Sequence, residues 1–246
     1  MSTALVPRWR APYLIVQGSD NALTLPVYSA AGVQQTATVG TVTIKRGLTP
    51  TEVVTDAAAT ALGPPVSYTL LAAATSALTL DPIERWDVQW TLTIGGVAYK
   101  FRRPGWLTEF DLWPQIIDTD LESEAAEVQR FRTAGGALTS FQVQRSDAWE
   151  YLIRDLYARG VQVHLVTDGG ALVQAHLFRT LGTLYGTAAS SLQDERYERK
   201  ATEYMGRYHD EIAKPLPMDR DADGAIDQQD ERAEDLHPWD FRPRAW

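Results

Sequence analysis

Residues 86–103 read WDVQWTLTIGGVAYKFRR, so apolar and polar side chains alternate on both sides of a Gly-Gly pair. Two such runs around Gly95 and Gly96 predict a β-hairpin with a two-residue turn. Counting outward from the turn gives the expected pairs Ile94 with Val97, Leu92 with Tyr99, and Trp90 with Phe101. Because side chains alternate along a strand, we expect these paired residues on a buried face. The residues between them are expected on the solvent face: Thr91, Thr93, Lys100 and Arg102.

Similar sequence extends through the first 108 residues, which are rich in Thr, Val, Ala, Gly and Pro. Further short strands are expected at residues 23–29, 36–44, 53–60, 66–71 and 78–80. About seven short strands joined by turns are typical of a small immunoglobulin-like β-sandwich.

The composition changes near residue 109. Residues 1–108 hold 8 Lys/Arg and 6 Asp/Glu, whereas the rest of the chain holds the other 41 charged residues. Four amphipathic helices are predicted. The first begins at a capping box formed by Thr119 and Glu122 and runs to residue 132, and the second runs from Ser146 to residue 159. The third follows Asp168, the fourth covers 197–212, and a short strand is expected at 161–166. We therefore expect an α+β protein: an immunoglobulin-like β-sandwich at 1–108, a small helical bundle at 109–217, and a loop and extended tail at 218–246.

Composition also limits the class of function. With 246 residues, 44% of them hydrophobic, the chain can form real cores, and its net charge of −9 argues against a main task of neutralising nucleic-acid phosphates. It has no cysteine, which excludes disulfides, thiolate metal sites and cysteine nucleophiles. No apolar run approaches the length of a membrane span, and the N-terminal residues do not match a secretory signal peptide.

The sharpest motif is DRDADGAIDQQD at residues 219–230. A twelve-residue calcium loop places oxygen ligands at positions 1, 3, 5, 7, 9 and 12 around a glycine at position 6. The ligands here would be the carboxylates of Asp219, Asp221, Asp223, Asp227 and Asp230 and the carbonyl of Ala225. The loop resembles an EF-hand loop and, with Asp at position 12, resembles the loop of dockerin-type modules more closely. Because prolines precede the loop and no second loop follows, we expect weak Ca²⁺ binding, with a Kd on the order of 10⁻⁴ M or higher. The alternative is an acidic surface turn without metal.

Catalytic motifs are absent from the sequence. The histidines His164, His176, His209 and His237 show no metal-ligand spacing, and no phosphate loop or nucleophile elbow occurs. We expect His164, His176 and His209 at ordinary surface or edge positions. A glycosidase carboxylate pair has no local spacing and stays open, but nothing favours it, so we do not expect an enzyme.

The last ten residues, HPWDFRPRAW, form a second unusual segment. Its prolines prevent a helix, and large aromatic side chains are costly to leave in water. We expect Trp239, Phe241 and Trp246 to dock on another protein chain. The alternative is that the tail folds back on its own domain.

Three stretches of the helical part form a pattern: ALVQAHLFRTLGTLY at 171–185, DERY at 194–197 and ATEYMGRY at 201–208. An apolar helix ending in Leu-Tyr, a polar break and a Tyr-rich helix resemble the head-tail connector (adaptor) proteins of long-tailed bacteriophages, over residues 118–215. The resemblance implies a helical bundle that forms a homo-oligomeric ring, twelvefold in that family, beneath the portal protein. It also implies contact with a tail or tail-terminator protein.

The resemblance implies a structural protein of the virion neck, made in the host cytoplasm and not bound to a membrane. DNA would pass through the ring without sequence-specific binding, and a negative protein suits a channel lining to which DNA does not adhere. The alternative function is a secreted or surface module that uses the immunoglobulin-like domain and the dockerin-like loop for calcium-dependent recognition.

Overall fold

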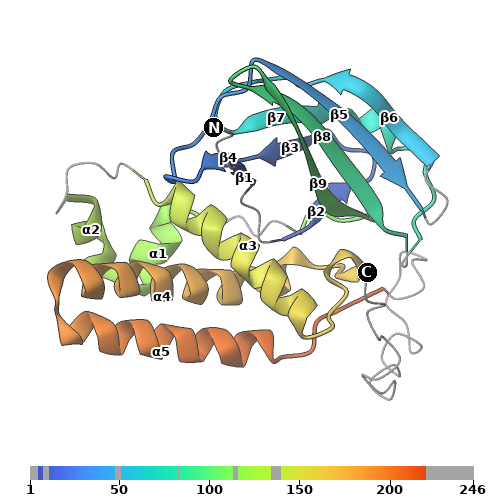
Figure 1. The fold of residues 1–246 in the computed structure, drawn as a ribbon. Helices are drawn as coiled ribbons and strands as arrows, with labels where there is room; N and C mark the ends of the chain where they lie inside the picture. Colours follow the sequence, from blue (N-terminus) through green and yellow to red (C-terminus); the bar gives the residue numbers. More distant parts are fainter. Residues whose placement is uncertain are drawn as a thin grey trace. The chain divides into compact units, whose positions relative to one another are not determined.

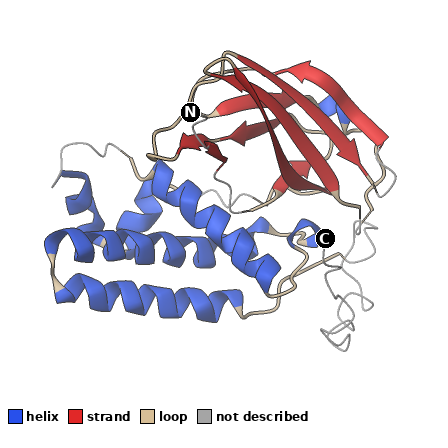
Figure 2. Cartoon of the chain, viewed as in Figure 1, coloured by secondary structure: helices blue, strands red, loops and turns tan. Residues whose placement is uncertain are grey.

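The computed structural model describes residues 5–7, 11–47, 51–81, 84–112, 116–133 and 140–219. The protein is α+β, with a sheet-rich N-terminal part followed by helices (Figure 2). The chain divides into two compact units: the first, here called the β unit, ends at Asp111, and the second, the helical unit, runs from Leu112 to Asp219.

Strands of the β unit form one large sheet and two strand pairs (Figure 1). The strands are β1 (Leu5–Pro7), β2 (Tyr13–Val16), β3 (Asn21–Leu25), β4 (Val27–Ser29), β5 (Val39–Arg46), β6 (Thr51–Ala58), β7 (Val66–Leu70), β8 (Trp86–Ile94) and β9 (Val97–Thr108). The large sheet has the order β2-β9-β8-β5-β6, and the pairs are β3-β7 and β1-β4. The short 3-10 helix η1 (Ala72–Ala74) follows β7.

The β8–β9 hairpin confirms the expected register. Ile94 pairs with Val97, Leu92 with Tyr99, and Trp90 with Phe101. Gly95 and Gly96 have φ angles of 58° and 80°, which side chains with a Cβ adopt at a steric cost. Alternate residues of β8 are buried, from Trp86 to Ile94, as the apolar and polar alternation predicts.

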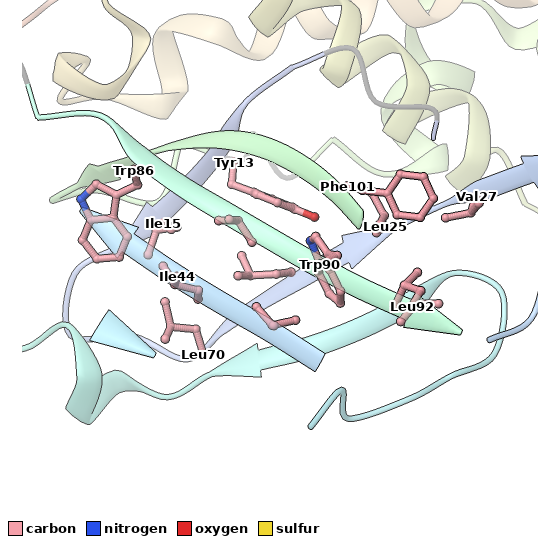
Figure 3. Close-up of a cluster of buried hydrophobic side chains, with 14 of the residues drawn as sticks. Tyr13, Ile15, Leu25, Val27, Ile44, Leu70, Trp86, Trp90, Leu92 and Phe101 are labelled. Carbon is pink, nitrogen blue, oxygen red and sulfur yellow. The ribbon is translucent and has the colours of Figure 1, made fainter. Parts of the chain in front are cut away.

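The core of the β unit lies between the inner faces of its strands, where aromatic and branched side chains interlock (Figure 3). Trp86 and Trp90 of β8 are fully buried there, beside residues of β2, β3, β5 and β7. The residues contributed by those strands include Ile15, Leu25, Ile44 and Leu70.

Three strand predictions differ from the structure. Residues 23–29, expected as one strand, are divided between β3 and β4, which belong to different strand pairs. Residues 78–80 form no strand, since Leu78 contributes its carbonyl to the side chain of Gln17 and not to a ladder. The unpredicted strand β2 fills an edge of the large sheet instead, pairing parallel with β9 from Tyr13 against Gly105 to Val16 against Thr108.

The helical unit contains two long antiparallel helices, α4 and α5, and several shorter elements (Figure 1). Its elements are α1 (Asp118–Glu124), η2 (Ala126–Val128), α2 (Gln129–Thr133), α3 (Gln142–Ala158), η3 (Val163–Leu165), η4 (Gly169–Leu172), α4 (Val173–Leu192) and α5 (Glu195–Ile212). Helix α4 ends at Leu192 and is followed by Gln193, whose φ of 51° is left-handed. Asp194 caps α5 by accepting a hydrogen bond from the Arg196 N–H at 2.9 Å.

Three local predictions for this unit were wrong. Residues 161–166 contain η3 and not a strand, because Val163, His164 and Leu165 are all buried in one turn. The first expected helix breaks at Ala125 and is capped by Asp120, which accepts from the Ile117 N–H at 2.7 Å. Helix α3 begins at Gln142, one turn before the predicted cap at Ser146.

Candidate assembly surface and metal loop

A cluster of stacked rings joins α4 to α5, and we call Phe131, Tyr185, Tyr197 and Tyr204 the tyrosine cluster. The rings of Tyr185 and Tyr204 lie parallel within 3°, with centroids 5.5 Å apart. Phe131 of α2 meets Tyr185 and Tyr197 edge-on at 5.5 Å each. Because aromatic pairs favour these offset and edge-on geometries, the cluster fixes the α4–α5 packing and ties α2 to it.

Glu127 of η2 connects the cluster to the charged face of α5. Its Oε1 accepts a hydrogen bond from the Tyr185 hydroxyl at 2.8 Å and forms an ion pair with Lys200. Burial disfavours the ionised carboxylate, but Lys200 and Tyr185 outweigh that effect and lower the pKa of Glu127. Burial, with Glu127 beside it, raises the pKa of Tyr185, so the hydroxyl stays a donor.

A second polar network, around Asp118, joins α1, α2 and α3. The Asp118 carboxylate pairs with Arg132 at 2.6 Å and with Arg145 at 3.1 Å, and it accepts the Phe141 N–H at 3.1 Å. The side chain therefore does more than complement the dipole of α1, since it fixes the start of α3 against α1.

Two histidines expected at surface or edge positions are buried. His164 is 6% exposed, and His176, on α4, is 0% exposed. The Nε2 of His176 lies 2.7 Å from the Arg145 carbonyl and donates to it, since a carbonyl only accepts. Burial lowers the pKa of His176 to about 4, so this imidazole is neutral and structural.

The predicted calcium loop begins on a short bridge at the end of the helical unit. Met218 pairs with Val166, and the Asp219 N–H donates to the Leu165 carbonyl at 2.9 Å. Asp219 is 4% exposed, so the first predicted ligand is held at a fixed, covered position. The other predicted ligands, Asp221, Asp223, Ala225, Asp227 and Asp230, lie outside the described residues.

The remaining predicted site residues also lie beyond the described ranges. These are Trp239, Phe241 and Trp246 of the tail. Within residues 5–219, and excluding the gaps in the description, no three acidic or histidine side chains gather as a metal-binding group. Asp219 is the one residue of the predicted loop that lies within these ranges.

The sequence reasoning missed Arg179, which is the only charged residue of α4. It lies between Tyr151 of α3 and Tyr208 of α5. The feature of the sequence that could have revealed this residue is a single cation in an otherwise uncharged helix. Because burial of an unpaired charge is costly, such a cation is expected to have a specific contact. The clusters thus consist of structural ion pairs and stacked rings. Such an arrangement holds helices rigidly together.

Comparison with protein-family models, curated proteins and solved structures finds no match. Among the described helices, none is both long enough and apolar enough to cross a membrane.

Proposed function

We propose that this chain is a non-enzymatic head-tail connector of a long-tailed bacteriophage neck. It would form a homo-oligomeric ring, most simply of twelve copies, between the portal and a tail or tail-terminator protein. The observation that carries the proposal is the α4–α5 pair. The residues that resemble the connector family are the ones that pack this pair, from Leu177 and Leu181 to Tyr204 and Tyr208.

A subunit that joins two rings is served by internal rigidity. The tyrosine cluster and the Glu127 and Asp118 networks cross-link every α-helix of the helical unit that the structure describes. The net charge of −9 also suits a channel through which DNA slides. The proposed functional divisions are a β domain at 1–108, a connector domain at 109–217 and a metal loop with docking tail at 218–246.

We further propose that the β unit is an immunoglobulin-like sandwich. In such sandwiches, strands C′, C, F and G form one sheet and strands B and E belong to the other. The order β6-β5-β8-β9 corresponds to the first set, and the β3-β7 pair corresponds to the second. A departure from antibody domains is that the buried tryptophans, Trp86 and Trp90, lie on β8 and no disulfide is available.

The strand order also favours the second candidate function, a calcium-dependent recognition module. The two functions predict different assemblies, so native mass spectrometry of the full chain with the portal protein of the same phage separates them. A connector adds about 330 kDa to the portal ring, the mass of twelve copies. A recognition module adds no mass to the portal and changes only its calcium-dependent binding to other targets.

A further inference from the structure

The guanidinium of Arg179 is held between two tyrosine rings from neighbouring helices. Its Cζ lies 4.7 Å from the ring centroid of Tyr151 and 5.1 Å from that of Tyr208. A second guanidinium, that of Arg154, lies 4.5 Å from the Tyr151 ring centroid. Cation–π contacts with two rings restrain the Arg179 guanidinium. We call Arg179, Tyr151, Tyr208 and Met205 the Arg179 clamp.

The contacts with the tyrosine rings do not provide hydrogen-bond acceptors for the N–H groups of this guanidinium. Nη1 contacts the Met205 Sδ at 3.6 Å, and a thioether is a weak acceptor. Nε is buried and has no hydrogen-bond partner within the described part of the chain. An arginine presents five N–H donors, so most of its capacity to donate is unused by these neighbours.

The nearest acid does not complete the clamp. Asp155 pairs with Arg154 at 2.7 Å and accepts the Tyr208 hydroxyl at 2.8 Å. Among the described residues, no carboxylate lies within ion-pair distance of Arg179. The side chain is half-buried, so its positive charge is partly desolvated. The Arg179 charge helps to lower the pKa of Asp155, but that carboxylate is already paired with Arg154 and makes no ion pair with Arg179.

We propose that the Arg179 clamp binds an Asp or Glu carboxylate of a neighbouring copy of this chain. The two Nη groups of a guanidinium match a carboxylate through two parallel hydrogen bonds, which here would replace the weak contact of Nη1 with Met205. A side chain already restrained by stacking loses little freedom when it binds. Each copy carries 32 acidic residues against 23 basic ones, so identical copies offer surplus carboxylates, whereas the net charge repels nucleic-acid phosphates. The inference rests on the proposed ring, in which a clamp on one copy meets a different surface of the next.

Sedimentation equilibrium of the full chain over a wide concentration range tests the proposal. Arg179→Lys keeps the charge but removes the fork and Nε, and we expect it to weaken self-association about tenfold or more. The matched control is Arg196→Lys on α5, an exposed arginine paired with Asp194 at 3.4 Å, which should leave the association constant unchanged. The proposal would be overturned if the wild-type chain stays monomeric throughout, or if the association constant of Arg179→Lys is unchanged. The clamp would then only stabilise the packing of helices within one chain.

A second measurement keeps the test valid if the variant loses its fold. On the wild-type chain, sodium acetate should weaken association more than sodium chloride at the same ionic strength, because acetate competes for the clamp. Equal effects of the two salts would count against a carboxylate ligand.

Self-association through the clamp without added mass on the portal would retain this inference and contradict the connector function. Incorporation of Arg179→Lys into neck rings at wild-type levels would contradict this inference and retain the connector function.

Discussion

Gly182 of α4 and Met205 of α5 approach so closely that a Cβ on Gly182 would lie 2.8 Å from the Met205 Sδ and 3.5 Å from its backbone nitrogen. The Met205 side chain therefore fills the space that a side chain at Gly182 would need between α4 and α5. One turn later, a Cβ on Gly186 would meet Ala201 at 4.0 Å, an ordinary contact. The tight approach is therefore local to Gly182.

Gly182→Val should destabilise the helical unit because its branched side chain would push Met205 and α5 outward. We expect the free energy of unfolding to fall by about 1–3 kcal/mol, as in other overpacked interiors. Chemical denaturation followed by far-UV circular dichroism measures it. Gly206→Ala on the exposed side of α5, where a Cβ meets nothing within 4 Å, should instead stabilise by about 0.5–1 kcal/mol. Destabilisation by both substitutions would show that helix packing is not the cause.

Stability should fall as the pH is lowered because His176 is buried neutral. Its folded pKa of about 4 is below the unfolded value of 6.5, so below pH 6.5 the unfolded state binds a proton that the folded state does not. The loss begins near pH 6.5 and continues to pH 4, reaching about 2 kcal/mol at pH 5. In His176→Gln, whose amide can still donate to the Arg145 carbonyl, this component should vanish. Equal losses between pH 7 and pH 5 in the two proteins would contradict the assignment.

How far the sequence predicts the fold depends on whether the signal is local. The β8–β9 hairpin follows from turn chemistry and is confirmed. The amphipathic helix expected across 197–212 follows from periodicity: of its expected stripe, Tyr197, Tyr204, Tyr208 and Ile212 are buried, and Ala201 is half-buried. Strand β2 was missed because YLIV pairs with β9, some ninety residues away, and its own sequence shows no alternation.

The candidate site was less predictable for a related reason. A one-sided apolar stripe was expected on α4, but α5, α3 and α1 all pack against it. Residues that a single stripe would leave outside, His176 and Arg179 among them, therefore lie in contacts between helices. Such positions depend on how four helices assemble, which periodicity within one helix does not encode.

The calcium prediction is tested by calorimetry. Because five carboxylates this close repel one another without a cation, we expect Ca²⁺ to bind the loop of residues 219–230 with a Kd on the order of 10⁻⁴ M or higher, and Mg²⁺ to bind less well. Asp221→Ala should abolish the heat of binding. No heat at millimolar Ca²⁺ with the wild-type chain would leave the motif an acidic turn.

Removal of residues 237–246 should separate docking from folding. Each buried aromatic anchor contributes about 1.5–3 kcal/mol, so Trp239, Phe241 and Trp246 would bind weakly in one copy and firmly when a ring engages many tails. We expect an unchanged thermal midpoint of the isolated chain and loss of its incorporation into necks. Unfolding of the truncated monomer would mean that the tail belongs to its own core.

The central claim is a ring of this chain between portal and tail, and a cryo-EM reconstruction of the neck without imposed symmetry tests it most directly. We expect twelve copies of the helical unit in a closed ring on the portal, with α4 and α5 packed through Gly182 and the tyrosine cluster. A neck with six copies, or with none, would contradict the account.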